Sequence, residues 1–161
     1  MNLTFDEAEI LVDDILDRLD EQEEMGCEVI ICPPLPYLEM LTDYEFEEQR
    51  FNVGAQNCSA YDKGAYTGEV SAKMLKSIDV DYCIVGHSER RKYFGETNEI
   101  LAEKINRLIE NNVSPIVRRK SERYVKILKL QISYQDMDRC HLTYICFSSF
   151  ELLCHQSHNS H

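Results

Sequence analysis

Short apolar or β-branched runs alternate along the chain with stretches that carry apolar residues at helical spacing. The runs occupy residues 28–32, 51–55, 82–85 and 114–117. Continuous apolar runs of this length suit strands buried on both faces rather than half-exposed antiparallel strands. Strands that alternate with helices at this pace indicate parallel βαβ units, with functional residues in the loops that follow the strand carboxyl ends.

Amphipathic patterns predict the helices between these runs. Thr4 and Glu7 have capping-box spacing just before the first periodic stretch. The helices are expected at residues 5–23, 36–41, 69–77 and 100–109, with a short helical turn beginning at His87.

Composition changes abruptly after about Val117. All six glycines and all four prolines precede this point, and residues 1–117 carry a net charge of −15 against +3 for residues 118–161. Glycine and proline are the strongest turn signals, so a segment without either offers few positions where turns are predicted. We therefore expect one domain over residues 1–117 and an unrelated tail over residues 118–161, either disordered or encoded out of frame.

The tail holds a group of potential metal ligands. Cys154, His155, His158 and His161 lie within its last eight residues. They suit a metal cluster or a disordered polar terminus, and the second reading is favoured because termini of this composition are seldom ordered.

Composition excludes several classes of protein. No uninterrupted apolar run is long enough for a membrane span and no secretory leader is visible, so a soluble cytoplasmic protein without membrane contact is expected. The net charge of −12 disfavours nucleic-acid binding. The cysteines are odd in number and include no Cys-x-x-Cys pair, which argues against a disulfide framework or a zinc ribbon and favours reduced, mostly buried thiols. They are Cys27, Cys32, Cys58, Cys83, Cys140, Cys146 and Cys154.

The glycine-punctuated loop over residues 54–69 is too long for a simple connector. Loops of this length in compact domains are either self-packed surface loops or binding loops. The residues alone leave both readings open.

A second motif, Val-Gly-His-Ser-Glu-Arg-Arg over residues 85–91, directly follows a predicted strand. A histidine at a helix N-terminus tends to stay neutral and can donate an N–H to a substrate carbonyl. His87 also suits a hydrogen-bonded loop histidine, and Glu89, Arg90 and Arg91 suit a salt-bridged surface turn.

In combination and order, these motifs resemble the triosephosphate isomerase family. They are Gly-Ala-Gln-Asn at residues 54–57, Gly-Ala-Tyr-Thr-Gly-Glu at 64–69, Ile-Val-Gly-His-Ser-Glu-Arg-Arg at 84–91 and Phe-Gly-Glu at 94–96. The resemblance extends from Met1 to about Val117. It implies an α/β fold, a partial (β/α)8 TIM barrel with about four parallel strands. It also implies a homodimer that interconverts dihydroxyacetone phosphate and D-glyceraldehyde 3-phosphate through an enediolate in glycolysis, without a metal or organic cofactor.

The resemblance also implies roles for individual residues. His87 would polarise the substrate carbonyl as a neutral imidazole, and Glu89 would act beside the catalytic lysine. Arg90 and Glu96 would form an ion pair that braces the histidine loop. The dimer interface would include Gln56, Asn57, Tyr66, Thr67, Gly68 and Glu69.

The sequence departs from the family at both ends. The family's first strand ends in Gly-Asn-Trp-Lys-Met-Asn, so its catalytic lysine would precede Met1. No match to the catalytic glutamate or the phosphate-binding loops follows Val117. We therefore expect a fragment with open edge strands that is inactive alone. The alternative is a non-catalytic fragment that docks with an intact isomerase subunit, and a phosphate-binding protein is the weakest reading.

Overall fold

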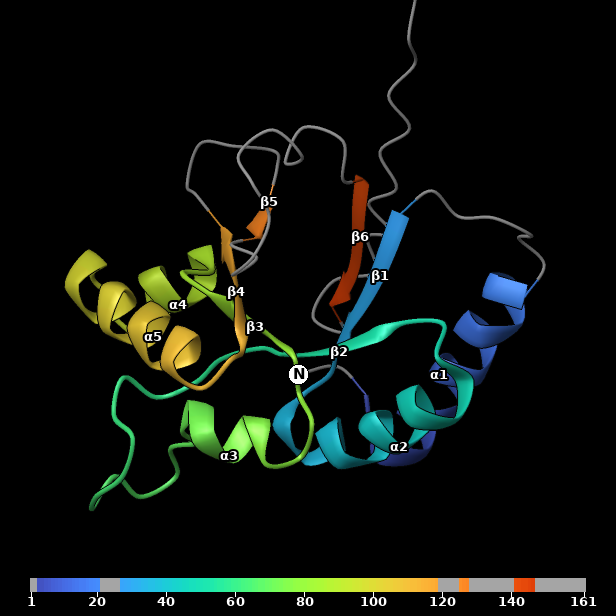
Figure 1. Cartoon of the computed structure of the whole chain (residues 1–161), viewed down its shortest axis with the longest axis horizontal. Helices are drawn as coiled ribbons and strands as arrows, with labels where there is room; N and C mark the ends of the chain where they lie inside the picture. The colour runs from blue at the N-terminus through green and yellow to red at the C-terminus, as the bar shows by residue number, and fades with distance from the viewer. Residues whose placement is uncertain (1–2, 21–26, 119–124, 128–140, 147–161) are drawn as a thin grey trace, which may run out of the picture.

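Four parallel strands form the centre of the fold in the computed structural model, which describes residues 3–20, 27–118, 125–127 and 141–146 (Figure 1). The strands are β1 (Cys27–Cys32), β2 (Asn52–Ala55), β3 (Tyr82–Val85) and β4 (Ser114–Arg118). They pair in chain order, β1 with β2, β2 with β3 and β3 with β4, and every pairing is parallel. All four predicted strands are therefore confirmed.

Two further strands flank this group. β5 (Val125–Ile127) pairs antiparallel with β4, and β6 (His141–Cys146) pairs parallel with β1, from Cys27 opposite His141 to Cys32 opposite Cys146. The sheet order is β5-β4-β3-β2-β1-β6. The sheet is therefore open, as expected, but its edge strands are β5 and β6 rather than β1 and β4. That residues 118–161 are unrelated to the family stays a prediction.

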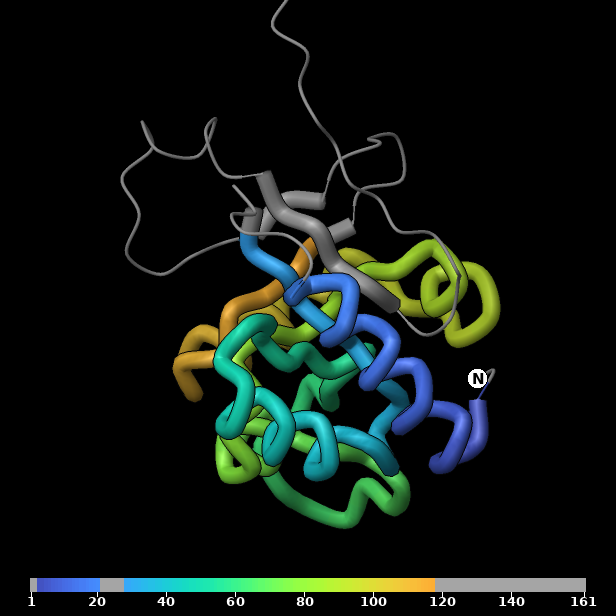
Figure 2. The backbone as a smooth tube through the Cα atoms, turned by 90° about the vertical axis from the view of Figure 1, so that its right-hand side faces the viewer, coloured from blue at the N-terminus to red at the C-terminus, as the bar shows by residue number. Residues whose placement is uncertain are grey.

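One helix precedes β1, and the others lie in the connections between β1, β2, β3 and β4, as parallel pairing requires. They are α1 (Phe5–Asp20), the 3-10 turn η1 (Leu35–Tyr37), α2 (Leu38–Glu48), α3 (Ala72–Lys76), α4 (Ser88–Tyr93) and α5 (Asn98–Glu110). Figures 1 and 2 show α1, α2 and α3 on one side of the sheet. The predicted site residues lie in the segments that follow β2 and β3.

Local hydrogen bonds explain where the helix boundaries differ from the predictions. α3 begins at Ala72 rather than residue 69, because the Ser71 hydroxyl accepts from Met74 N and caps the helix there. α2 runs seven residues past Leu41, to Glu48, and ends where Gln49 adopts a left-handed conformation at φ 54°. α1 starts as predicted, with the Glu7 carboxylate accepting from Thr4 N at 2.8 Å. Of its predicted end, residues 21–23 lie outside the described ranges.

Alternate strand residues enter two separate apolar clusters. Val29 and Ile31 pack in the cluster shared with the helices, whereas Ile30 belongs to a second cluster with Tyr82 and Ile84. Ile30 and Ile31 are both fully buried. Burial on both faces is why these strands read as unbroken apolar runs, and each buried isoleucine contributes about 1.5–3 kcal/mol.

We expect a chain that ends at Arg118 to aggregate, because β1 and β4 would lose β6 and β5 and expose unpaired N–H and C=O groups. Light scattering during thermal unfolding, with the 161-residue chain at equal concentration as control, measures the effect. An equally stable and equally monomeric short chain would show that neither outer strand protects the sheet.

Candidate functional site

The predicted histidine lies where the resemblance expects it, directly after β3. His87 is the N-cap of α4, and its Nδ1 accepts from the backbone N–H of Glu89 at 3.4 Å. Gly86 precedes it at φ 71°, and a Cβ on Gly86 would come within 2.9 Å of Leu101 Cδ2, so only glycine fits this turn. The strand end and the cap together fix the position of the imidazole.

The two residues predicted to be catalytic differ in solvent exposure. The His87 side chain is 18% exposed, whereas that of Glu89 is 62% exposed. Glu89 Oε2 lies 3.6 Å from His87 Nδ1. The nitrogen that accepts from a backbone N–H carries no proton, so a neutral ring in this geometry holds its proton on Nε2.

A buried ionic network lies behind the histidine loop. Glu96 Oε1 accepts from Arg90 Nε at 2.6 Å and from Lys104 Nζ at 2.5 Å. Lys104 Nζ also donates to Asn57 Oδ1 at 2.7 Å. The Lys104 and Glu96 side chains are 5% and 4% exposed. The network therefore joins the loop after β2, the loop after α4 and helix α5 through one buried ammonium group.

Lys104 and Arg90 together keep the Glu96 carboxyl ionised. Burial alone would raise the pKa of this carboxyl, but the hydrogen bonds from Lys104 and Arg90 outweigh burial and lower the pKa. Its second oxygen, Oε2, is buried and has no hydrogen-bond partner within the described ranges. Glu96 is thus held as a carboxylate by Oε1 alone.

Sequence reasoning paired Glu96 with Arg90 only and missed Lys104. Lys104 follows Leu101 by three residues and precedes Leu108 by four, which places it on the buried face of α5. A lysine on the apolar face of an amphipathic helix was the available signal, because a buried ammonium needs an anionic partner.

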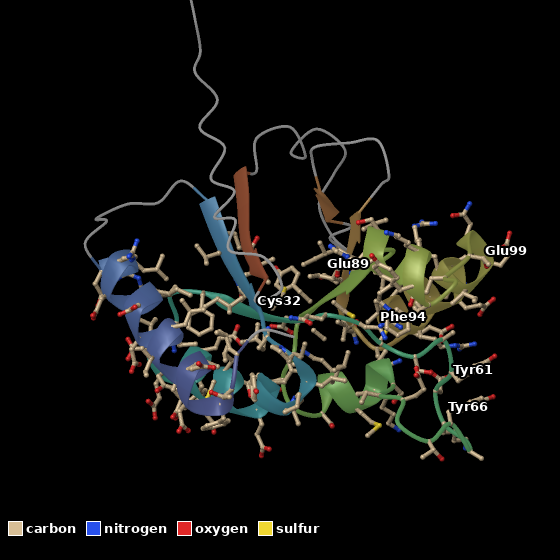
Figure 3. The ribbon with its side chains drawn as sticks, turned by 180° about the vertical axis from the view of Figure 1, so that it is seen from behind. Cys32, Tyr61, Tyr66, Glu89, Phe94 and Glu99 are labelled. Carbon is tan, nitrogen blue, oxygen red and sulfur yellow. The ribbon has the colours of Figure 1, made fainter. Side chains whose placement is uncertain are left out.

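The loop after β2 folds back on itself between Ser59 and Val70. Ser59 N donates to Val70 O at 2.8 Å and closes its base. The rings of Tyr61 and Tyr66 stack with their centroids 4.1 Å apart and nearly parallel (Figure 3). A Cβ on Gly64 would lie 2.9 Å from the Tyr66 ring, so the stack also requires that glycine. The self-packed reading of this loop is correct, while its role in binding stays a prediction.

The predicted interface residues fall into two groups. Gln56 and Asn57 are half-buried at the base of the loop, where Gln56 Nε2 donates to Cys32 O at 2.9 Å. The other four residues are exposed on the loop: Tyr66, Thr67, Gly68 and Glu69. In Figure 3, Tyr61 and Tyr66 lie close together on the loop and away from Glu89, which belongs to α4. The tip of the loop is therefore exposed to solvent.

No group of three potential metal ligands occurs within the described ranges. Residues 154–161, with the cysteine and three histidines considered above, lie outside those ranges. Among the described helices, none is both long enough and apolar enough to cross a membrane.

Comparison with known proteins gives a consistent answer. The family model described as triosephosphate isomerase matches residues 1–133. The chain is 42% identical to the triosephosphate isomerase of Clostridium tetani over 120 residues, covering 73% of this chain and 44% of that protein. It is 43% identical to the enzyme of Bacteroides fragilis over 116 residues, 72% of this chain and 45% of that one. The chain spans less than half the length of these curated relatives.

A solved structure agrees with the sequence relatives. The triosephosphate isomerase of Bartonella henselae superposes with a TM-score of 0.54 at 34% identity, covering 56% of this chain and 38% of that one. With four parallel strands in chain order, the expectation of a partial (β/α)8 barrel is confirmed.

We expect Lys104→Met to lower the free energy of unfolding by about 3 kcal/mol at pH 7, because it leaves a buried carboxylate one cation short. Arg107→Met is the matched control on the same helix, since the ion pairs of Arg107 lie at the surface, where solvent screens them, and should contribute much less. Urea denaturation measures both changes.

The pH dependence gives a second check on the same variant. The folded pKa of Glu96 is lowered, so its stabilisation is complete above the unfolded value of 4.5 and is lost as pH falls through the folded pKa. The deficit of Lys104→Met should therefore shrink in acid. A deficit that is constant down to pH 2 would exclude the ionic explanation.

Proposed function

Because the chain belongs to the triosephosphate isomerase family, we propose that His87 is the electrophile in the interconversion of dihydroxyacetone phosphate and D-glyceraldehyde 3-phosphate. The observation that carries this proposal is the cap geometry, in which Nδ1 accepts from Glu89 N. With Nδ1 held by this bond, Nε2 is the ring nitrogen that would donate to a substrate carbonyl.

The charge state of the ring follows from the same geometry. The backbone N–H of Glu89, in the first turn of α4, points its positive end at Nδ1 and disfavours a proton there. Triosephosphate isomerase is the usual illustration of a histidine kept neutral in this way, so this role of His87 comes from the resemblance and the cap geometry supports it. A neutral Nε2–H polarises the carbonyl and passes a proton between the two enediolate oxygens.

Glu89, Arg90 and Glu96 support the histidine in this proposal. The backbone N–H of Glu89 sets the tautomer of His87, and its exposed carboxylate stays available to a lysine of the family's type. The Arg90–Glu96 pair ties α4 to the loop that follows it. Holding reacting groups in place contributes to catalysis by removing orientational entropy before the reaction begins.

Within these 161 residues the resemblance assigns no equivalent of the catalytic lysine or the glutamate base. We therefore propose that the chain isomerises triose phosphates at close to the uncatalysed rate on its own, since proton abstraction and charge stabilisation are lost together. The whole protein would act as a cytoplasmic homodimer in glycolysis, without a cofactor.

A chimera tests the catalytic proposal directly. Residues 1–117 would replace the matching segment of the Clostridium tetani triosephosphate isomerase, and we expect the chimera to be active. His87→Gln in the chimera should lower kcat by about 10²–10⁴ while the 161-residue chain stays near background. Glu99→Gln, at an exposed position of α5, is the control.

Three results would count against the proposal. A folded chimera without activity would show that this segment does not supply the electrophile. Full activity in His87→Gln would assign the role to another residue. Turnover by the 161-residue chain alone would contradict the proposed dependence on groups outside it.

A second candidate function is docking to an intact isomerase subunit. The observation that favours it is the closed loop between Ser59 and Val70, which presents the exposed Tyr61 and Tyr66 rings already stacked. Rigid tyrosine surface is typical of binding interfaces, and a loop ordered in advance loses little entropy on docking.

We expect the 161-residue chain to retain the Clostridium tetani isomerase in a pull-down, and Tyr66→Ala to weaken retention about tenfold or more. Tyr66→Phe keeps the stack and should bind like the original chain. Equal retention of all three chains, or none by the original chain, would reject the docking function.

A further inference from the structure

One arginine contacts both peptide groups that flank His87. Arg91 Nε donates to the carbonyl oxygen of Gly86 at 3.1 Å, and the backbone N–H of Arg91 donates to the carbonyl oxygen of His87 at 3.1 Å. The guanidinium is anchored in turn, since Arg91 Nη1 donates to Asn98 Oδ1 at 2.9 Å. Arg91 therefore ties the turn after β3 to the first residue of helix α5.

The turn needs such an anchor because it contains Gly86. This residue has φ 71°, and glycine reaches many other conformations at little cost because it has no Cβ. Leu101 occupies the space that a Cβ would need, with Leu101 Cδ2 2.9 Å from that position. Apolar contact is non-directional, whereas a hydrogen bond to the Gly86 carbonyl sets the direction of its peptide group. The Arg91 side chain supplies that bond from a rigid planar fork of donors.

The two adjacent arginines of α4 have different partners. Arg90 pairs with the buried carboxylate of Glu96. Within the described residues, the side chain of Arg91 instead donates to two neutral oxygens, on Gly86 and Asn98. A charged donor makes a stronger hydrogen bond to a carbonyl than a neutral donor does. The Arg91 guanidinium thus orients backbone, whereas that of Arg90 balances a buried charge.

We propose that Arg91 is a positioning residue for His87, which holds the turn so that the imidazole stays at the cap of α4. This inference rests on the function proposed for His87 above. The Gly86 carbonyl belongs to the planar peptide group that contains the His87 nitrogen, so its direction sets where the His87 side chain begins. That side chain accepts from Glu89 N at 3.4 Å, a long hydrogen bond that a small rotation of the turn would break.

Loss of this bond would change the chemistry of the ring. Without the Glu89 N–H on Nδ1, the neutral imidazole could carry its proton on either nitrogen. Nε2 would then lose both its direction and part of its N–H population. A misplaced electrophile weakens transition-state stabilisation more than substrate binding, so the effect is expected in kcat rather than in KM.

The first test needs no turnover and uses the 161-residue chain labelled with 15N at histidine. The ring signals of His87 are those that disappear in His87→Gln, and their 15N shifts show which nitrogen carries the proton. At about pH 8.5, where imidazoles are neutral, we expect the proton on Nε2. Arg91→Met should move the Nδ1 signal toward that of a protonated nitrogen.

Two further variants complete this test. Lys92→Met is the matched control, because Lys92 is exposed on the same helix and contacts Tyr93 rather than the turn. It should leave both His87 signals in place. Asn98→Ala removes the anchor of the guanidinium at an exposed position and should shift the signals in the same direction, by less. This variant decides the question if Arg91→Met does not fold.

The second test uses the chimera described above. Arg91→Met should lower its kcat about 10–100-fold and change KM by less than about threefold. In the His87→Gln chimera the same substitution should have almost no effect, because the group that Arg91 positions is gone. Lys92→Met should leave kcat unchanged in both.

Unchanged His87 spectra in both Arg91→Met and Asn98→Ala would overturn the proposal. An Arg91→Met effect on kcat of equal size with and without His87 would also overturn it, because Arg91 would then act on the fold in general. Full activity of the His87→Gln chimera would reject the function proposed for His87 instead, while the spectra of the 161-residue chain judge the position of the ring independently of turnover.

Discussion

The buried pair of Lys104 and Glu96 holds together the parts of the chain that carry chemistry. One ammonium group donates to Glu96 and to Asn57, so helix α5, the loop after α4 and the loop after β2 meet at a single nitrogen. Desolvating these charges is costly, and the cost is offset only while both partners and Arg90 are in place. The position of the His87 loop relative to the loop after β2 therefore depends on an interaction that contacts neither His87 nor the loop tip.

Much of the fold could be predicted because burial on two faces leaves a clear pattern. The four central strands and helix α5 read directly from apolar runs and helical spacing. Boundaries set by single hydrogen bonds were less visible, as at Ser71, whose hydroxyl starts α3 later than the apolar pattern suggested. β6 was not predicted, since strand pairing between residues more than a hundred positions apart, such as Cys27 and His141, has no local signal. β5 pairs with the nearby β4 but was not predicted, because the residues after Val117 were read as an unrelated tail.

The site was predicted in part, and the reason is again physical. The resemblance to the family identified His87, Arg90 and Glu96, and the structure gives a physical reason for part of that motif, since Gly86 at φ 71° is a position that favours glycine. Lys104 was missed because its partners come from other elements, and helical spacing alone assigned it no role. The Tyr61–Tyr66 stack was missed for a similar reason, since four residues of irregular loop separate two rings that only the closed backbone brings together.

The pairing at both edges of the central four strands explains how a partial barrel can be stable. In a closed barrel every strand has two neighbours and no edge is left unpaired. Here β6 continues the parallel sheet beside β1, where a preceding barrel strand would lie, and β5 pairs with β4 in the opposite sense. The two additions satisfy the edge groups that four strands leave unpaired. Within the described residues the Lys104 network is made by Glu96, Arg90 and Asn57, so its contacts lie within residues 57–104, apart from the strand pairings that protect the sheet.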